Sequence, residues 1–213
     1  MELGSCRLYG ILDLAYVLPA NAASVAKAMI EGGVDVMQLR AKNQNQSDLV
    51  TLAKMLRALT SARHVPFVVN DYPDIARSVD ADGAHVGQDD MPIAEARREA
   101  GPDCIIGKST HSLAQAKAAI AEGADYIGFG PLFATPTKPD YDAIGLADIA
   151  AMHGMTDRPI FCIGGIKLEN LPDVIAAGAR RVVIVSGLLQ APDIARYARH
   201  AKDLLDQAAA TQS

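Results

Sequence analysis

A short junction recurs along this chain of 213 residues. A glycine, a small apolar residue and a polar residue occur together in copies that begin at Gly33, Gly83, Gly123 and Gly178. The spacings are 50, 40 and 55 residues, close to multiples of a unit of about 25 residues. Such a junction is typical of a helix that ends on glycine before a buried strand begins. Eight units of this kind account for the whole chain.

Short runs rich in valine and isoleucine alternate with alanine-rich stretches that have helical spacing. The expected strands are Arg7–Leu12, Val34–Leu39, Pro66–Val69, Ala84–Gly87, Cys104–Gly107, Tyr126–Gly130, Pro159–Ile163 and Val182–Ser186. The expected helices include Ala22–Ile30, Leu49–Leu59, Leu113–Ala121 and Leu171–Ala177, with N-caps at Asn21 and Ser47 and C-caps at Gly32, Gly123 and Gly178. Continuous apolar strands are typical of a parallel sheet covered on both faces.

These patterns predict the α/β class and, within it, a single-domain TIM (β/α)8 barrel over residues 1–213, with a polar tail after about residue 205. The rival architecture is an open, doubly wound sheet. That fold is disfavoured because no Gly-x-Gly-x-x-Gly turn follows the first expected strand.

Composition narrows the class of partner. The net charge of -5 argues against nucleic acid, whose binding domains usually carry a basic surface. No apolar run is long enough to span a bilayer, so we expect no membrane partner. Cys6, Cys104 and Cys162 lie in or beside apolar segments and are interpreted as buried thiols of a cytoplasmic protein. The sequence does not decide between a monomer and a homo-oligomer.

Two acidic clusters follow neighbouring expected strands. Asn70-Asp71 comes after the third strand, and Gln88-Asp89-Asp90 after the fourth. In a TIM barrel these strand ends meet at one mouth, where function gathers. Carboxylates beside cations there favour magnesium, which takes carboxylate, water and phosphate oxygens together. The alternative is helix capping, because Asp90 lies two residues before Pro92 and Asp71 also precedes a helix. Strand periodicity does not choose between Asp89 and Asp90.

The second and fifth strand ends carry candidate substrate-binding groups. Gln38-Leu39-Arg40-Ala41-Lys42 places polar side chains at alternate positions, and its cations suit phosphate oxygens; a strand entering a solvated loop is the alternative. Gly107-Lys108-Ser109-Thr110-His111 offers Ser109 to a substrate or as a helix cap. His111 is interpreted as structural rather than as a general base. His64, His85, His153 and His200 have no sequence neighbours that indicate catalysis.

The last three strand ends are typical of phosphate binding. Thr135-Pro136-Thr137-Lys138-Pro139-Asp140 offers amides, hydroxyls and a cation, or is a surface loop. Ile163-Gly164-Gly165-Ile166 and Val185-Ser186-Gly187 follow strands seven and eight, whose loops form the phosphate cup of many TIM barrels. Two anion-binding regions and one magnesium site predict two phosphorylated substrates, or one substrate with phosphates at both ends.

The ordered set of strand-end motifs resembles the thiamine-phosphate synthase family. The motifs are Gln38-Leu39-Arg40-Ala41-Lys42, Asn70-Asp71, Gly87-Gln88-Asp89-Asp90, Gly107–Ser109, Gly130-Pro131, Thr135–Lys138, Ile163–Ile166 and Val185-Ser186. Their order and spacing over nearly the whole chain are far more specific than any one of them. The resemblance implies a TIM barrel that joins 4-amino-2-methyl-5-hydroxymethylpyrimidine diphosphate to a thiazole phosphate, forming thiamine phosphate and releasing pyrophosphate.

The resemblance also implies a role for each site residue. Magnesium is assigned to Asp71 and Asp90, which selects Asp90 over Asp89. The pyrimidine diphosphate is assigned to Gln38, Arg40, Lys42, Asn70, Ser109 and Lys138, and the thiazole phosphate to Thr135, Thr137, Gly165, Val185 and Ser186. Departures from the family pattern lie beside the motifs, at Lys108, Phe133-Ala134 and Leu12-Asp13.

The implied chemistry is a Mg²⁺-assisted, dissociative loss of pyrophosphate, with Arg40, Lys42, Ser109 and Lys138 as the catalytic residues. No catalytic nucleophile is needed, because the enzyme neutralises the leaving group and positions the second substrate. Two alternatives remain. A thiazole tautomerase-like isomerase would use His111 as an acid–base residue, and a non-catalytic barrel would only bind phosphorylated ligands.

Overall fold

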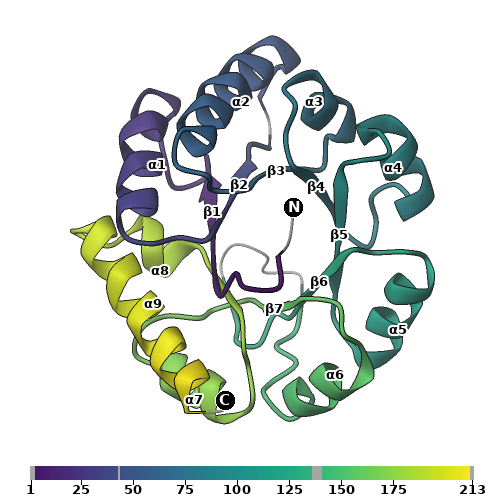
Figure 1. The fold of residues 1–213 in the computed structure, drawn as a ribbon, viewed down its shortest axis with the longest axis vertical. Helices are drawn as coiled ribbons and strands as arrows, with labels where there is room; N and C mark the ends of the chain where they lie inside the picture. Colours follow the sequence, from purple (N-terminus) through teal and green to yellow (C-terminus); the bar gives the residue numbers. More distant parts are fainter. Residues whose placement is uncertain (1–2, 43, 136–140, 212–213) are drawn as a thin grey trace.

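The strands of the protein close into a barrel, seen end-on in Figure 1. This computed structural model describes residues 3–42, 44–135 and 141–211. The strands pair in parallel and in chain order, and the last strand pairs with the first. They are β1 Leu8–Asp13, β2 Val36–Arg40, β3 Phe67–Asn70, β4 Gly83–Val86, β5 Ile105–Thr110, β6 Tyr126–Phe129, β7 Ile160–Cys162 and β8 Val182–Ile184. The predicted TIM barrel is therefore confirmed.

Helices surround the barrel on its outside (Figure 1). Their bounds are η1 Pro19–Asn21, α1 Ala22–Glu31, α2 Gln46–Ser61, α3 Pro73–Ser78, α4 Ile93–Ala100, α5 Leu113–Ala121, α6 Ile149–Met155, α7 Leu171–Ala176, α8 Ser186–Leu189 and α9 Ile194–Ala210. Helix α9 thus includes residues 206–210, which the sequence assigned to a polar tail. Within the described part of the chain, no helix has the length and apolar character needed to cross a membrane.

The predicted helix ends are partly correct. Asn21 and Gly32 are the caps of α1, although the Asn21 side chain makes no capping hydrogen bond. Ser47 was the wrong N-cap: Asn45 takes that place and accepts a hydrogen bond from the Asp48 amide. Gly123 and Gly178 each follow the C-cap residue by one position, with φ of 92° and 103°. Glycine is favoured at this point because the chain turns there through left-handed backbone conformations.

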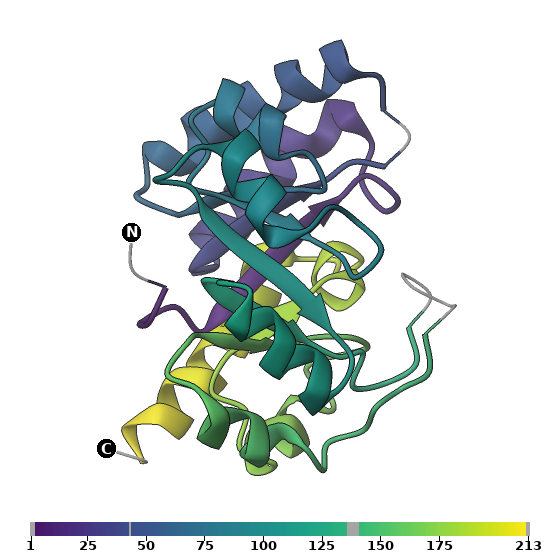
Figure 2. The same ribbon diagram turned by 90° about the vertical axis from the view of Figure 1, so that its right-hand side faces the viewer.

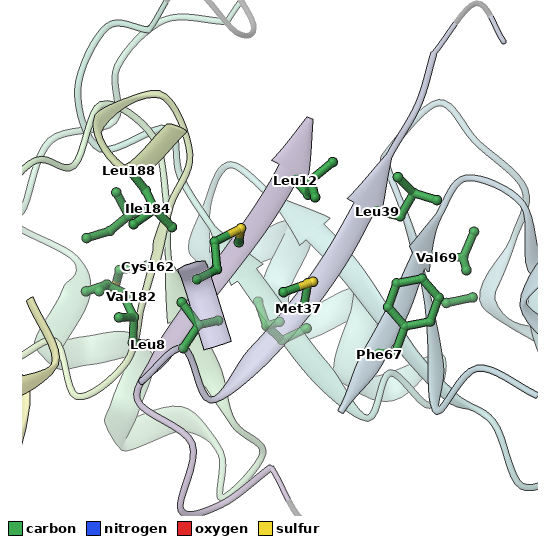
Figure 3. Close-up of a cluster of buried hydrophobic side chains, with 14 of the residues drawn as sticks. Leu8, Leu12, Met37, Leu39, Phe67, Val69, Cys162, Val182, Ile184 and Leu188 are labelled. Carbon is green, nitrogen blue, oxygen red and sulfur yellow. The ribbon is translucent and has the colours of Figure 1, made fainter. Parts of the chain in front are cut away.

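Side-chain alternation along the strands divides the interior into two layers. Apolar residues that point outward, such as Leu12, Leu39 and Val69 (labelled in Figure 3), belong to a cluster that also contains buried helix residues. Residues at the other strand positions, including Tyr9, Val68 and Phe161, form a separate cluster inside the barrel. Polar side chains at inward-pointing positions near the strand ends therefore lie in the barrel mouth, and the outer apolar layer stays intact.

The two ends of the barrel differ. In side view both chain termini lie at the end where the strands begin, and the strand arrows point away from them (Figure 2). Leu3 and Cys6 belong to the inner cluster, so the N-terminal segment helps to close that end. Cys6, Cys104 and Cys162 are buried free thiols, as predicted. Only the opposite end, where the strands finish, gathers the predicted site residues.

Two glycines make room for aromatic rings inside the barrel. In the strand register Gly107 lies between His85 on β4 and Tyr126 on β6. A Cβ atom at Gly107 would lie 2.1 Å from the Tyr126 ring, and one at Gly128 would lie 3.4 Å from the His85 ring. The rings therefore occupy space that a larger residue at position 107 would need.

We expect Gly107→Ala to lower the free energy of unfolding by about 1–3 kcal/mol, because the added methyl overpacks the barrel against Tyr126. The matched control is Gly154→Ala in α6, where an added Cβ meets nothing within 4 Å. This control should be neutral or stabilising by up to about 1 kcal/mol, as expected for alanine in a helix. Urea denaturation measures both, and equal stabilities of the two variants would contradict the packing argument.

Candidate active site at the barrel mouth

A pocket opens at the carboxyl ends of the strands. Eight of the predicted site residues line it, namely Gln38, Arg40, Asn70, Ser109, Thr135, Gly165, Val185 and Ser186. They come from widely separated parts of the sequence, and the closed barrel brings them around one space. Predicted residues Thr137 and Lys138 lie outside the described residues.

The acidic residues and Lys42 form a second group beside Arg40. The Lys42 ammonium lies 3.6 Å from the Asp71 carboxylate. Burial, and next the charge of Asp90, raise the pKa of Asp71, and the Asp90 side chain is also its hydrogen-bond partner. Lys42 and Arg40 oppose this rise. The barrel thus brings the two predicted magnesium ligands together.

Asp71 occupies an unusual backbone conformation. Its φ of 67° is left-handed, and its amide donates to the His85 carbonyl at 2.9 Å. Aspartate and asparagine tolerate this region better than most residues, and strained positions of this kind cluster at functional sites. The turn directs Asp71 to Asp90, away from a capping role. The N-cap of α3 is Tyr72, so the capping interpretation of Asp71 is wrong.

The adjacent carboxylates of the second acidic cluster have different partners. Asp90 accepts a hydrogen bond from the Gly87 amide. Asp89 instead accepts one from the Tyr141 hydroxyl at 3.1 Å. Pro92 is the N-cap of α4, so neither aspartate caps that helix. Of these two aspartates, Asp90 is the one that raises the pKa of Asp71.

Asp71 and Asp90 suit a hard cation that is completed by other oxygens. Two interacting carboxylates, of which Asp71 has a raised pKa, form a site that a divalent cation would stabilise. Within the described residues there is no group of three or more metal-binding side chains. Mg²⁺ usually keeps several waters and uses one or two carboxylates together with substrate phosphates. The residues present fit that coordination.

Arg40 has a partner that the sequence did not reveal. Its guanidinium donates to the Asp13 carboxylate at 2.6 Å. Asp13 is 1% exposed and also accepts from the Ala15 amide at 2.9 Å. The two residues are direct register partners at the ends of β1 and β2. Asp13 therefore orients Arg40 toward the pocket, and the only sequence cue was an unusual first strand end.

Ser109 belongs to the pocket and is not a helix cap. It lies within β5, and α5 is capped by Ser112. Its hydroxyl lies 2.9 Å from Nε2 of His85, which also lines the pocket. His85 has no sequence neighbours that indicate catalysis, and its contacts with Ser109 and Tyr126 come from other strands.

His111 also lines the pocket, at the end of β5. Its Nδ1 contacts the Gly130 carbonyl, and its amide donates to Gln115. Its ring lies against the Tyr141 ring, with centroids 4.2 Å apart. These contacts support the structural role that the sequence predicted for His111.

The loops after β7 and β8 form the opposite wall of the pocket. Gly164 and Gly165 have φ of 99° and 66°, and a Cβ atom at Gly164 would lie 2.4 Å from Pro131. Glycine is required because this loop and the loop after β6 approach so closely. Ser186 begins α8, and only Val185 separates it from the end of β8. This wall presents backbone and a hydroxyl, which suits a phosphate group.

Comparisons with known proteins agree with this geometry. The family described as thiamine monophosphate synthase matches residues 8–188. A thiamine-phosphate synthase of Chloroflexus aurantiacus is 44% identical over 93% of this chain and 92% of its own. One of Methanospirillum hungatei is 40% identical over 94% and 98%. The solved thiamine phosphate pyrophosphorylase of Pyrococcus furiosus has a TM-score of 0.90 at 32% identity, covering 97% of this chain and 99% of its own.

We expect Asp13→Asn to lower the free energy of unfolding by about 1–3 kcal/mol, because Arg40 loses its buried counter-charge. Asp206→Asn is a matched control, since Asp206 pairs with Arg7 and Lys202 at the surface with 43% of its side chain exposed. Exposed pairs contribute about 0–1 kcal/mol. Urea denaturation that finds equal losses would show that Arg40 does not depend on Asp13.

The Asp71→Asn variant tests the raised pKa of Asp71. A raised pKa means that the folded state holds the proton more tightly than the unfolded state does. Ionisation of Asp71 therefore lowers the free energy of unfolding as pH rises above the ordinary aspartate pKa of about 3.9. Asparagine also tolerates the left-handed backbone. Without Mg²⁺, the variant should therefore be more stable than the original protein at pH 7.

This gain should shrink as pH falls toward 4, because the raised pKa favours uptake of a proton by Asp71 in the folded state. Urea denaturation at both pH values measures it. Asp89→Asn is the control, because Asp89 is not among the groups that raise the pKa of Asp71, and it should not reproduce the stabilisation of Asp71→Asn. A gain of the same size at both pH values would contradict the assigned cause.

Proposed function

This chain belongs to the thiamine monophosphate synthase family, and from that membership we propose that it is a transferase that makes thiamine phosphate. The observation that carries the proposal is that one pocket at the barrel mouth has two walls of different chemical character. One wall holds Gln38, Arg40 and Ser109, and the other holds Gly165 and Ser186. Two phosphorylated molecules can therefore meet in one space.

The proposed substrates are 4-amino-2-methyl-5-hydroxymethylpyrimidine diphosphate and a thiazole phosphate. Gln38, Arg40, Lys42, Asn70, Ser109 and Lys138 would bind the pyrimidine diphosphate, with Arg40, Lys42, Ser109 and Lys138 as catalytic residues. Thr135, Thr137, Gly165, Val185 and Ser186 would bind the thiazole phosphate. The grouping of Gln38, Arg40, Asn70 and Ser109 on the β2–β5 side supports this division.

The proposed reaction exchanges one bond for another. The bond between the exocyclic carbon of the pyrimidine and the diphosphate oxygen breaks, and the electron pair leaves with pyrophosphate. The thiazole nitrogen then supplies the pair for the new carbon–nitrogen bond. Arg40 and Lys42 would stabilise the charge that develops on the leaving group. Asp71 and Asp90 would hold Mg²⁺, which would supply further charge neutralisation when bound.

Other features of the proposal follow from the same chemistry. A dissociative step needs no protein nucleophile, so the enzyme acts through charge and positioning.

The substrates are small molecules, and the three free cysteines support a cytoplasmic location. An isomerase related to the thiazole tautomerases is the second candidate, because His111 lies at the pocket.

A two-substrate assay with and without Mg²⁺ tests the proposal. Thiamine phosphate and pyrophosphate should form in equal amounts, and only when both substrates and Mg²⁺ are present. Isomerisation of the thiazole phosphate alone would favour the second candidate. Binding of both substrates without turnover would instead indicate a non-catalytic ligand-binding barrel.

The neighbouring aspartates give a matched test of the metal assignment. Asp90→Asn should raise the Mg²⁺ concentration needed for half-maximal activity by at least the ~10–100-fold that loss of an outer-shell partner costs. Among the described residues, Asp89→Asn alters the contact with Tyr141, and it should leave the Mg²⁺ dependence within a few-fold of the original. Equal Mg²⁺ titration curves for the two variants would refute the assignment to Asp90.

A further inference from the structure

A continuous chain of hydrogen bonds crosses the barrel interior beneath the pocket. Gln38 Nε2 donates to Tyr9 Oη at 2.8 Å, and Tyr9 Oη lies 3.1 Å from Tyr126 Oη. Tyr126 Oη lies 3.0 Å from His85 Nδ1, and His85 Nε2 lies 2.9 Å from Ser109 Oγ. Five strands contribute one residue each. The chain begins and ends at Gln38 and Ser109, both of which line the pocket.

The middle of this chain is enclosed by apolar atoms. Tyr9 and Tyr126 are each 1% exposed, and the Phe161 ring packs edge-on against both, with centroid distances of 5.2 and 5.8 Å. Burial raises the pKa of both phenols, so each keeps its proton. Each tyrosine can therefore donate one hydrogen bond and must accept the others.

Counting protons gives the chain a direction. The Gln38 amide nitrogen only donates, so Tyr9 Oη accepts there. Tyr126 is the other described partner of Tyr9 Oη, and it must receive the Tyr9 proton. The Tyr126 proton then points to His85 Nδ1, the described partner that remains.

The imidazole transmits this direction to the pocket. A neutral histidine that accepts at Nδ1 carries its proton on Nε2 and donates there, in this case to Ser109 Oγ. Ser109 Oγ thus accepts a hydrogen bond from His85 on the side of the barrel interior. Among the described residues no acceptor is seen for the Ser109 hydroxyl proton, so this proton can be donated to a molecule in the pocket.

We propose that this chain makes Ser109 a hydrogen-bond donor to the substrate and that His85, Tyr126 and Tyr9 are positioning residues for the reaction. The inference rests on the proposed function for the identity of the substrate, but the proton order itself does not. The Ser109 hydroxyl proton is therefore available to an acceptor of the substrate, such as a ring nitrogen or a phosphate oxygen. Gln38 is held by the same chain of hydrogen bonds, so Gln38 and Ser109 are oriented together.

The opposite direction is chemically distinct. If the Gln38 amide accepted from Tyr9, every proton in the chain would reverse and His85 would carry its proton on Nδ1. Ser109 would then donate to His85 Nε2 and could only accept from the substrate. The tautomer of His85 therefore decides between the two directions.

Nitrogen NMR of histidine-labelled, ligand-free protein at about pH 8, above the ordinary histidine pKa, measures the tautomer. The protein has five histidines, and the signal absent from the His85→Gln spectrum identifies His85. We expect protonated Nε2 and unprotonated Nδ1. Tyr126→Phe removes the donor to Nδ1 and should shift the Nδ1 resonance. A proton on Nδ1 in the original protein would overturn the proposal.

Turnover of matched His85 variants tests the positioning role. His85→Gln keeps a donor near the position of Nε2, whereas His85→Leu has none. His85→Leu should lose about 10–100-fold in kcat/KM for the pyrimidine diphosphate, as for loss of an outer-shell partner, and His85→Gln should recover most of it. Circular dichroism and thermal unfolding confirm that each variant is folded.

Equal losses in both folded variants would overturn the positioning role. If His85→Leu does not fold, Tyr126→Phe replaces it, because it removes one hydroxyl at nearly constant volume. Tyr126→Phe should then lower kcat/KM by a similar factor, and unchanged kinetics would contradict the proposal. A wild-type protein that binds both substrates without turnover refutes the proposed function alone, because the NMR measurement still reports the direction of the chain.

Discussion

The closed parallel register of the barrel is the constraint on which the rest of the structure depends. Because alternate side chains along each strand point inward, one choice of register sets every residue that faces the mouth. Register makes Asp13 the partner of Arg40, and it places Gly107 between His85 and Tyr126. A shift by one residue on any strand would move these groups into the outer apolar layer. The register that packs the core therefore also assembles the site.

Charge in the mouth is arranged in linked pairs. Asp13 neutralises Arg40 within the barrel, and Lys42 partly offsets the two interacting carboxylates at the rim. The remaining excess of negative charge lies at Asp71 and Asp90, which the left-handed turn at Asp71 holds close together. This arrangement costs stability in the free protein and suits a site that is completed by a cation and a phosphorylated ligand.

The fold was largely predictable, because each βα unit carries its own local pattern. All eight strands were expected within a few residues of their observed positions, and helix α5 has the predicted bounds of Leu113–Ala121. Helix ends were less predictable: the sequence predicts Ser47 as the cap of α2, but the side chain that reaches the free amide belongs to Asn45. Small polar residues in adjacent positions can all cap a helix, so local pattern alone does not choose among them.

Sequence by itself determined the barrel and the strand-end groups, because strand and helix periods and turn glycines are local properties. Only the tertiary structure decided what those groups contact. Tyr9 and Tyr126 are separated by 117 positions, and no sequence pattern near either residue indicates the hydrogen bond between them. The same holds for His85, which looked isolated along the chain and lies between Ser109 and Tyr126 in space. The physical reason is that closure of the barrel sets distances across its interior, and these distances depend on all eight strands together.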